Sequence, residues 1–403
     1  MPEPVIVAAT RTPIGRAFKG SLVDCRPDDL AAHAVTSALG QVPELDPSEV
    51  EDLLLGCGLP GGEQGYNMAR VVAVLAGLDR TPGTTITRYC ASSVQAVRSA
   101  AHAIRAGEGD VFVCAGVEAV SRYGKGTSDG LPDTMNPRFD EAQQRTAARA
   151  EGGAERWEPR DGLPDVYIAM GQTAENVAQI EDVDREEMDR FAAMSQQRAV
   201  ASQQEGVFDP EITPVTLPDG STVDADDGPR PNTTEEKLAG LPPAFRPDGA
   251  VTAGNSCPLN DGAAATVVMS DQRARELGIT PRARVVATGV SALDPEIMGL
   301  GPVDSSRMAL DRAGMTIDDV DLVEINEAFA AQVIPSARHL GVDWDRLNVL
   351  GGSIALGHPF GMTGARILTT LLNAMDRRDA QVGLETMCVG GGQGMAMIVE
   401  RLS

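Results

Sequence analysis

The sequence predicts an α/β protein built from two similar halves, and two patterns carry this prediction. Short strand patterns alternate with helical patterns up to about residue 120, which is typical of a parallel or mixed sheet covered by helices. The same order of strands and helices returns from residue 282 onwards as a weak internal repeat. The 403 residues are enough for two such halves, packed face to face around a substantial core.

The first half is expected to begin with a strand at residues 5–9. A helix should run from Pro27 to about Leu39, since Asp28 and Asp29 complement the positive end of its dipole. The other elements expected in this half are a strand at 50–56, a helix at 67–78, a β-like segment at 83–88, a small-residue helix at 91–106 and a buried strand at 111–115.

The middle of the chain differs from both halves in composition and in its pattern of elements. Between residues 121 and 247, Pro, Asp, Glu, Arg and Gln are frequent, strand patterns fade, and isolated helices are expected at 170–180 and 185–204. We interpret this segment as an insertion that packs over the α/β body. The predicted layout is an N-terminal half at 1–120, completed by about 248–272, an inserted loop domain at 121–247, and a C-terminal half at 273–403.

The second half repeats the first in order. A strand at 285–289 corresponds to the strand at 5–9, and one at 320–326 corresponds to the strand at 50–56. The strand ending in Cys388 corresponds to the one ending near Cys114, and the helix after His358 to the helix after Cys90. The repeat therefore predicts that Cys90 and His358 stand at equivalent helix entrances and meet at the interface between the halves.

Charge and cysteine usage narrow the class of protein. A net charge of −24 argues against nucleic acid and membrane partners, because such a surface repels polyanions. No apolar run approaches the roughly 20 residues of a membrane span, and the N-terminus lacks the basic segment of a signal peptide. The six cysteines are scattered without a C-x-x-C pair. These features predict a cytoplasmic protein with reduced thiols and no metal site.

His358 is the first candidate functional residue. It lies between Gly357 and Pro359, where proline biases the preceding residue to extended geometry and no propensity explains a histidine. The glycines that follow let the backbone pass close to other segments before a helical pattern begins. The other three histidines lie in or near helical patterns, where packed or solvated helix residues are expected: His33, His102 and His339. The setting favours a functional role for His358.

Cys90 is the second candidate, at the entrance of the helix at 91–106. The dipole and free N–H groups of a helix N-terminus are expected to lower the pKa of a thiol there and favour the nucleophilic thiolate. The alternative is a small buried apolar residue, an interpretation that suits Cys114, Cys25 and Cys57.

Cys388 stands at a strand end before the run Val389-Gly390-Gly391-Gly392-Gln393-Gly394. Such a run leaves backbone N–H groups bare and is suited to an oxyanion hole. A phosphate cradle is the rival interpretation, but the run lacks a Walker lysine and a G-x-G-x-x-G that opens a helix. Asn326 also follows a strand end, where a polar side chain can enter a site.

Five motifs occur together in one order: Cys90-Ala91-Ser92-Ser93, Val251-Thr252-Ala253-Gly254-Asn255, Asn326-Glu327-Ala328-Phe329, Gly357-His358-Pro359 and Cys388-Val389-Gly390-Gly391-Gly392. With these motifs the chain resembles the thiolase family (acetyl-CoA acetyltransferases and 3-ketoacyl-CoA thiolases) along essentially its whole length. The resemblance implies two similar α/β halves, packed as α-β-α-β-α layers, with an inserted loop domain. It also implies a homodimer or homotetramer.

The resemblance implies a role for each reacting group. Cys90 would be the nucleophile that becomes acylated, and His358 the base that activates it. Cys388 would shuttle a proton to or from the acetyl-CoA enolate. Asn326 would hold a water that, with His358, binds the thioester oxyanion. The N–H groups of Cys90 and Gly390 would form a second oxyanion hole at the carbonyl under attack.

The resemblance also implies that CoA thioesters are the substrates and that no cofactor is bound permanently. Met170 would contact the pantetheine arm of coenzyme A, and Arg230 its adenine end, where an arginine would supply local positive charge. The other expected contacts are Ser256, Cys257 and Phe360. The chain departs from the family pattern at Thr87, Ser93, Cys257 and Ala169. These departures bear on pocket shape and substrate choice, since none removes a reacting group.

Phe360, Met362 and Ala169, with the segment 16–22, look more like degradative than biosynthetic members. We therefore expect thiolytic cleavage of 3-ketoacyl-CoA esters larger than acetoacetyl-CoA, in a β-oxidation-type degradation. A short-chain acetoacetyl-CoA thiolase that works in the condensing direction is the main alternative. A cysteine peptidase, a decarboxylating condensing enzyme and a non-catalytic acyl-CoA binding protein are more distant alternatives, because none of them needs all three of Cys90, His358 and Cys388.

Overall fold

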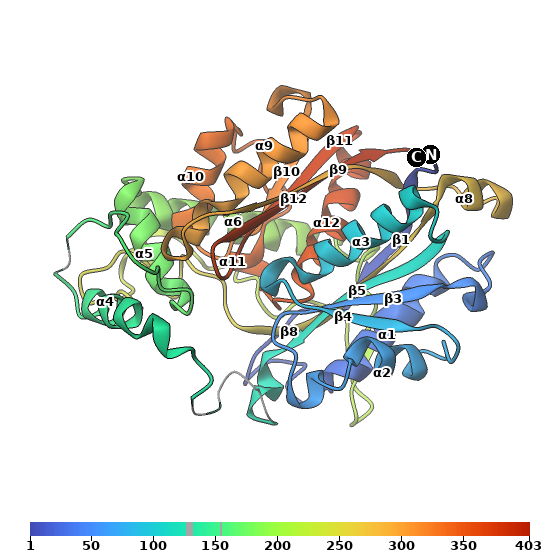
Figure 1. Cartoon of the computed structure of the whole chain (residues 1–403), viewed down its shortest axis with the longest axis horizontal. Helices are drawn as coiled ribbons and strands as arrows, with labels where there is room; N and C mark the ends of the chain where they lie inside the picture. Colours follow the sequence, from blue (N-terminus) through green and yellow to red (C-terminus); the bar gives the residue numbers. More distant parts are fainter. Residues whose placement is uncertain (126–130, 132, 154) are drawn as a thin grey trace.

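In a computed structural model of the chain, which describes residues 1–125, 131, 133–153 and 155–403, a mixed ten-stranded sheet runs through the molecule (Figure 1). Its strand order is β10-β11-β12-β9-β1-β8-β5-β3-β4, and the short β2 (Gly15–Arg16) pairs with β8. The pairing of β1 with β9 involves Val5 with Arg284 and Ile6 with Ala283. This narrow seam joins two half-sheets.

The two half-sheets have the same topology. The first contains β1 (Pro4–Arg11), β3 (Asp52–Cys57), β4 (Gly83–Ile86), β5 (Val111–Ala119) and β8 (Asn260–Ser270). The second contains β9 (Ala283–Ala292), β10 (Leu322–Ile325), β11 (Val382–Val389) and β12 (Gln393–Arg401).

Strand directions also correspond between the halves. In the first, β4, β3 and β5 are parallel, and the antiparallel β8 and β1 follow. In the second, a parallel bridge from Val323 to Leu347 takes the place of β4, β10 and β11 are parallel, and the antiparallel β12 and β9 follow. The predicted internal repeat is therefore confirmed.

Two helices form the middle layer. The helices α3 (Ser92–Ala106) and α12 (Thr363–Arg378) pack on each other and on strands of both half-sheets, as Figure 1 shows. All residues of α12 from Thr363 to Met375 are buried. A helix that is covered all round belongs in the centre of a protein, so α12 cannot be a surface helix.

The outer layers complete an α-β-α-β-α sandwich. The helices α1 (Pro27–Gly40) and α2 (Met68–Leu75) cover the first half-sheet, α9 (Gly301–Ala313) and α10 (Ala330–Leu340) cover the second, and α8 (Asp271–Leu277) follows β8. Separate apolar cores lie on the two outer faces and in the middle layer. The predicted fold class is confirmed.

The chain between β5 and β8 carries the expected isolated helices with the predicted bounds, α5 (Met170–Ile180) and α6 (Arg185–Gln204). It also carries elements that the sequence did not predict: α4 (Asp140–Ala150), α7 (Glu235–Ala239) and a hairpin of β6 (Val215–Thr216) and β7 (Thr222–Val223). In Figure 1 the green α5 and α6 lie beside α10 and the short α11 (Ser353–Leu356). The domain boundaries stay a prediction.

None of the helices in the described part of the chain is both long and apolar enough to cross a bilayer.

Candidate active site

Cys90 lies in a single 3-10 turn, Tyr89–Ala91, directly before α3. Its side chain is buried, and the backbone N–H groups of Cys90 and Gly390 hydrogen-bond to the thiol, which lowers its pKa. Burial has the larger effect and raises the pKa of Cys90 to about 12. The predicted lowering of this pKa is therefore wrong. Removal of the thiolate from water destabilises it more than the two N–H donors stabilise it.

His358 lies on the loop between α11 and α12 and is 1 % exposed. Its Nδ1 is 2.6 Å from the hydroxyl oxygen of Thr363, and that hydroxyl donates to the carbonyl of Pro359 at 2.8 Å. A hydroxyl has one proton, so Thr363 accepts from Nδ1–H and leaves Nε2 unprotonated. The amide nitrogen of Asn326 donates to Nε2 at 3.2 Å.

The imidazole of His358 is held neutral. Burial and, to a lesser extent, the positive charge of Arg366 lower the pKa of His358 to about 3. A neutral imidazole with an unprotonated Nε2 is a proton acceptor at physiological pH.

The backbone of the His358 loop is fixed by close approach to other strands. The N–H of His358 donates to the side-chain oxygen of Asn260 at 2.9 Å. A Cβ on Gly357, whose φ is +116°, would lie 2.6 Å from that same side chain. A Cβ on Gly361 would lie 2.3 Å from the carbonyl oxygen of Val117. These two glycines are needed because the loop passes against β5 and β8.

Cys388 is buried near the end of β11, in the strand that precedes Gly390. Burial, followed by the charges of Cys90 and Cys257, raises the pKa of Cys388. Burial and then Cys90 likewise raise the pKa of Cys257. The three thiols thus lie within electrostatic reach of one another.

A cavity of roughly 480 Å³ opens beside Cys90. Phe360 lines it as well, and the ring of Phe360 meets that of His358 edge-on at 5.2 Å. The wall is mainly apolar and includes residues 166–170 of the inserted segment. The lining residues are Leu59, Tyr89, Cys90, Thr134, Met135, Val166, Tyr167, Ile168, Ala169, Met170, Phe360, Gly390 and Gly391. Of the expected substrate contacts, the structure brings Met170 and Phe360 to Cys90.

Arg230 and Ser256 line a separate, smaller cavity of roughly 140 Å³, together with Arg16. Burial and the charge of Arg16 lower the pKa of Arg230, so the two guanidinium groups are neighbours. Ser256 bridges to Phe329, and the next residue, Cys257, donates its N–H to the carbonyl of Ala328. The segment 256–257 therefore connects the arginine cavity to the region of Cys90.

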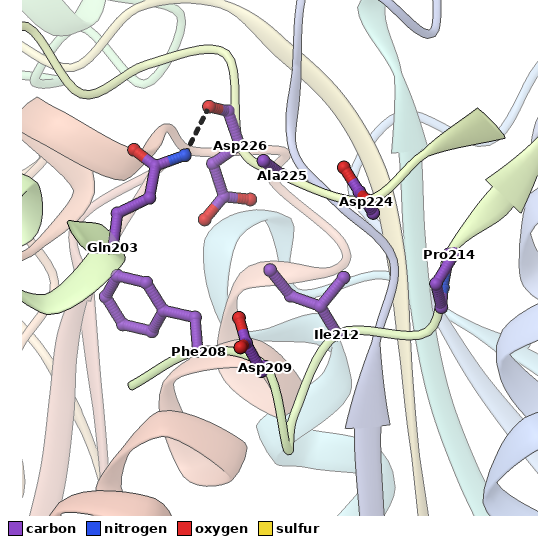
Figure 2. Close-up of a pocket in the computed structure, with 8 residues that line it drawn as sticks. All are labelled: Gln203, Phe208, Asp209, Ile212, Pro214, Asp224, Ala225 and Asp226. Atoms are coloured by element: carbon purple, nitrogen blue, oxygen red, sulfur yellow. Dashed lines mark hydrogen bonds between the residues drawn. The ribbon is translucent and has the colours of Figure 1, made fainter. Parts of the chain in front are cut away.

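Another cavity, of roughly 350 Å³, is lined by residues on and after the end of α6 and holds none of the expected site residues (Figure 2). Asp226 on its wall binds Arg11 through both carboxylate oxygens, at 2.7 and 2.9 Å. Figure 2 also shows the side chain of Gln203 donating to the carbonyl of Asp226. These contacts give Asp226 and Gln203 a structural role.

Sequence reasoning missed two residues that hold the site together. Thr363 fixes the tautomer of His358, and a threonine at a helix start gives no signal of that role. Glu118 of β5 is fully buried and accepts from the N–H groups of Gly58 (2.7 Å) and Gly361 (2.9 Å). The sequence does contain a signal for Glu118, because a carboxylate in a buried strand is unfavourable unless donors such as these surround it.

The comparisons with known proteins agree with this architecture. Residues 4–272 match the model of the thiolase N-terminal domain, and residues 279–401 match that of the thiolase C-terminal domain. The chain therefore belongs to the thiolase family and is an acyltransferase.

Two kinds of relative are similar over the full length. 3-Ketoacyl-CoA thiolases of Cronobacter sakazakii and Aeromonas hydrophila are each 44 % identical, with all of both chains covered. The crystal structure of the acetyl-CoA acetyltransferase of Bacillus anthracis superposes with a TM-score of 0.86 at 38 % identity, covering 100 % of this chain and 99 % of that one.

Proposed function

We propose that this thiolase cleaves 3-ketoacyl-CoA with coenzyme A, giving acetyl-CoA and a shortened acyl-CoA through an acyl-Cys90 intermediate. The observation that carries the proposal is the unprotonated Nε2 of His358, whose ring packs on Phe360, a residue that lines one cavity together with Cys90. The names of the full-length relatives support the same reaction.

In the first half-reaction, His358 Nε2 takes the proton of Cys90 as the sulfur attacks the 3-keto carbon. The N–H groups of Cys90 and Gly390, which already point at the thiol, stabilise the oxyanion at that carbon. The bond between carbons 2 and 3 then breaks, and the electron pair leaves as the acetyl-CoA enolate. Cys388 protonates the enolate carbon and becomes a thiolate.

In the second half-reaction, the Cys388 thiolate takes the proton of an incoming coenzyme A thiol, and the sulfur of that coenzyme A attacks acyl-Cys90. The Cys90 thiolate departs and recovers its proton from His358, so every group returns to its starting form. Because the pKa of Cys90 is raised and that of His358 lowered, the proton moves during attack and no ion pair exists beforehand.

Coenzyme A is proposed to lie across the two cavities. Its thiol end would enter past Met170, and its anionic end would meet Arg230 and Arg16, which line one cavity. Paired arginines supply the local positive potential that an anionic substrate needs on a protein of net charge −24. The expected contacts of Ser256 and Cys257 belong to the same proposal.

The acyl group is proposed to be larger than acetoacetyl, because the wall of the cavity beside Cys90 is mainly apolar. The second candidate is a short-chain acetyltransferase, which the similarity to the acetyl-CoA acetyltransferase of Bacillus anthracis favours. A cytoplasmic location is proposed as well, with all six cysteines as free thiols.

The inserted loop domain at 121–247 and a homodimer or homotetramer complete the proposal. The strand β4 is the last in its sheet, and Tyr66 nearby is 94 % exposed. Val74 and Leu75 of α2 are also exposed. An open strand edge beside exposed apolar side chains suits pairing with a second copy. Light scattering on the purified protein would measure the number of subunits.

Two variants test the reaction. Cys90→Ala should abolish turnover, and mass spectrometry should place the acyl group of a simple acyl-CoA on Cys90 in the unaltered protein. Cys388→Ala should still be acylated but lose carbon–carbon cleavage by about 100-fold, the scale of one general acid–base group. An acyl adduct on Cys388 or Cys257 would overturn the assignment, as would near-normal cleavage by Cys388→Ala.

A further inference from the structure

A chain of buried polar groups runs from Arg366 to the imidazole of His358. The Nη2 of Arg366 donates to the hydroxyl oxygen of Ser353 at 2.7 Å, and that hydroxyl donates to Oδ1 of Asn326 at 2.7 Å. The Nδ2 of Asn326 then donates to His358 Nε2 at 3.2 Å. All four side chains are buried, so water does not compete for these contacts.

Arg366 determines which group donates in the hydrogen bonds that lead from it to Asn326. A guanidinium group only donates, so Ser353 accepts from it and has one proton left to give. That proton goes to Oδ1 of Asn326, which leaves Nδ2 as the part of the amide that faces His358. The hydroxyl of Ser353 on one side and the unprotonated Nε2 of His358 on the other therefore select the same orientation of the amide.

Arg366 is an unusual residue to find here. It is 1 % exposed, and its Nε and Nη1 have no hydrogen-bond partner among the described residues. Within the same described part, both carboxylate oxygens of the buried Glu385 also lack one. The N–H donors of a buried cation normally hydrogen-bond to a nearby carboxylate. The hydrogen bond of Arg366 goes instead to a serine that leads to the proposed site.

We propose that Ser353 and Arg366 are positioning residues that fix the amide of Asn326 with its Nδ2 toward His358. This inference rests on the proposed function, because Asn326 and His358 are the groups assigned to the thioester oxyanion. The positioned amide directs an N–H donor at Nε2, which adds to the effect of Thr363 in keeping the proton on Nδ1. Ser353 and Arg366 themselves touch no reacting atom.

Ser353→Ala tests the inference, with Ser336→Ala as the matched control. Ser336 is also a fully buried serine, in α10, and its hydroxyl reaches the carbonyl of Gly299 at 3.3 Å. Ser353→Ala should lower kcat for thiolysis about 3- to 10-fold, the size of one lost hydrogen bond, with KM unchanged. Ser336→Ala should leave kcat unchanged.

A double-mutant cycle separates positioning from general damage. In an Asn326→Ala background, adding Ser353→Ala should have no further effect on kcat, since the amide it orients is gone. If the two effects multiply, Ser353 acts independently of Asn326 and the inference is wrong. Equal losses from Ser336→Ala and Ser353→Ala would overturn it as well.

A readout that needs no turnover keeps the inference distinct from the proposed reaction. Nitrogen-15 NMR of labelled histidine should show His358 as the Nδ1–H tautomer in both the unaltered protein and Ser353→Ala, because Thr363 fixes that proton. The Nε2 resonance should shift in Ser353→Ala toward that of an imidazole nitrogen without a hydrogen-bond donor, and should stay in place in Ser336→Ala. An unchanged Nε2 resonance in Ser353→Ala would overturn the inference even if thiolysis is observed. A protein that shows the Nε2 shift but cleaves no 3-ketoacyl-CoA would instead disprove the proposed reaction.

Discussion

Nδ1 of His358 lies 2.6 Å from Oγ1 of Thr363, and this contact decides which nitrogen of the imidazole is free to act as a base. Thr363 is at the first position of α12, and its hydroxyl is already committed to the carbonyl of Pro359. Nδ1 must therefore carry the proton, and Nε2 is turned toward Asn326. The start of one central helix thus sets the chemistry of the loop before it.

Thr363→Val should lower kcat about 5- to 10-fold. The isosteric valine cannot accept a hydrogen bond from Nδ1–H, so the Nδ1–H tautomer of His358 is no longer fixed. Thr369→Val is the matched control, since Thr369 is also fully buried in α12 and its hydroxyl donates to the carbonyl of Ala365. Steady-state thiolysis by both variants measures the difference. Similar losses from the two variants would show that Thr363 matters only for helix packing.

The pH dependence of Cys90 alkylation follows from its raised pKa. Below a pKa of about 12 the thiol is protonated, so the thiolate fraction should grow about tenfold per pH unit from about pH 6 to pH 9. His358, whose pKa is lowered to about 3, stays neutral over this range and should add no step near pH 6.5. Mass spectrometry of the iodoacetamide-labelled Cys90 peptide would follow the rate.

A different shape of that profile would contradict the structure. If Cys90 and His358 formed an ion pair at rest, reactivity would already be high below pH 7 and flat above it. The sequence also predicts a reactive thiol at neutral pH, but through the helix N-terminus alone, with burial left out of account. In the structure the pKa of Cys90 is raised and not lowered, since desolvation of the thiolate is the largest influence on it.

The sequence predicted the fold well because its signals are local and repeated. The strand at 5–9 and the helices at 170–180 and 185–204 are visible in their own residues, and all three are found. The seam of β1 with β9 could not be predicted in the same way. It joins Val5 to Arg284, and no local pattern specifies a pairing between strands so far apart.

The site was predictable to the extent that its residues stand in unusual local settings. Cys90 and His358 do so, and their meeting at the interface between the halves stays a prediction of the repeat. Ser353, in contrast, precedes an ordinary apolar run, and its partners Asn326 and Arg366 are 27 and 13 residues away. Their function depends on distances that only the folded chain supplies.

Arg16 and Arg230 should matter for binding and not for chemistry. Replacing either with Ala should raise KM for coenzyme A about 3- to 10-fold and leave kcat nearly unchanged, because the anionic end is bound equally throughout the reaction. Arg190→Ala is the control, since Arg190 is half-exposed and pairs with Glu186 on the helix surface. The KM of each variant is measured in the thiolysis direction.

The electrostatic origin of this effect can be checked with salt. The KM increase caused by Arg16→Ala should shrink at high ionic strength, because screening weakens the contact in the unaltered protein. A loss of kcat in either variant, with KM unchanged, would place these arginines in the catalytic step and contradict the proposed division into two cavities.

Acyl-chain preference should be set by the cavity beside Cys90, of roughly 480 Å³. Each buried methylene contributes about 0.8 kcal/mol, so kcat/KM for thiolysis should rise up to about fourfold per added carbon until the apolar wall ends. Phe360→Ala should move the optimum to longer chains, whatever it does to the overall rate through its contact with His358.

Phe18→Ala is the control, since Phe18 is exposed and outside the cavity lining. A series from acetoacetyl-CoA to long 3-ketoacyl-CoA esters decides the matter. If acetoacetyl-CoA is the best substrate, the enzyme is a short-chain acetyltransferase, and the cavity serves the pantetheine arm instead of the acyl group.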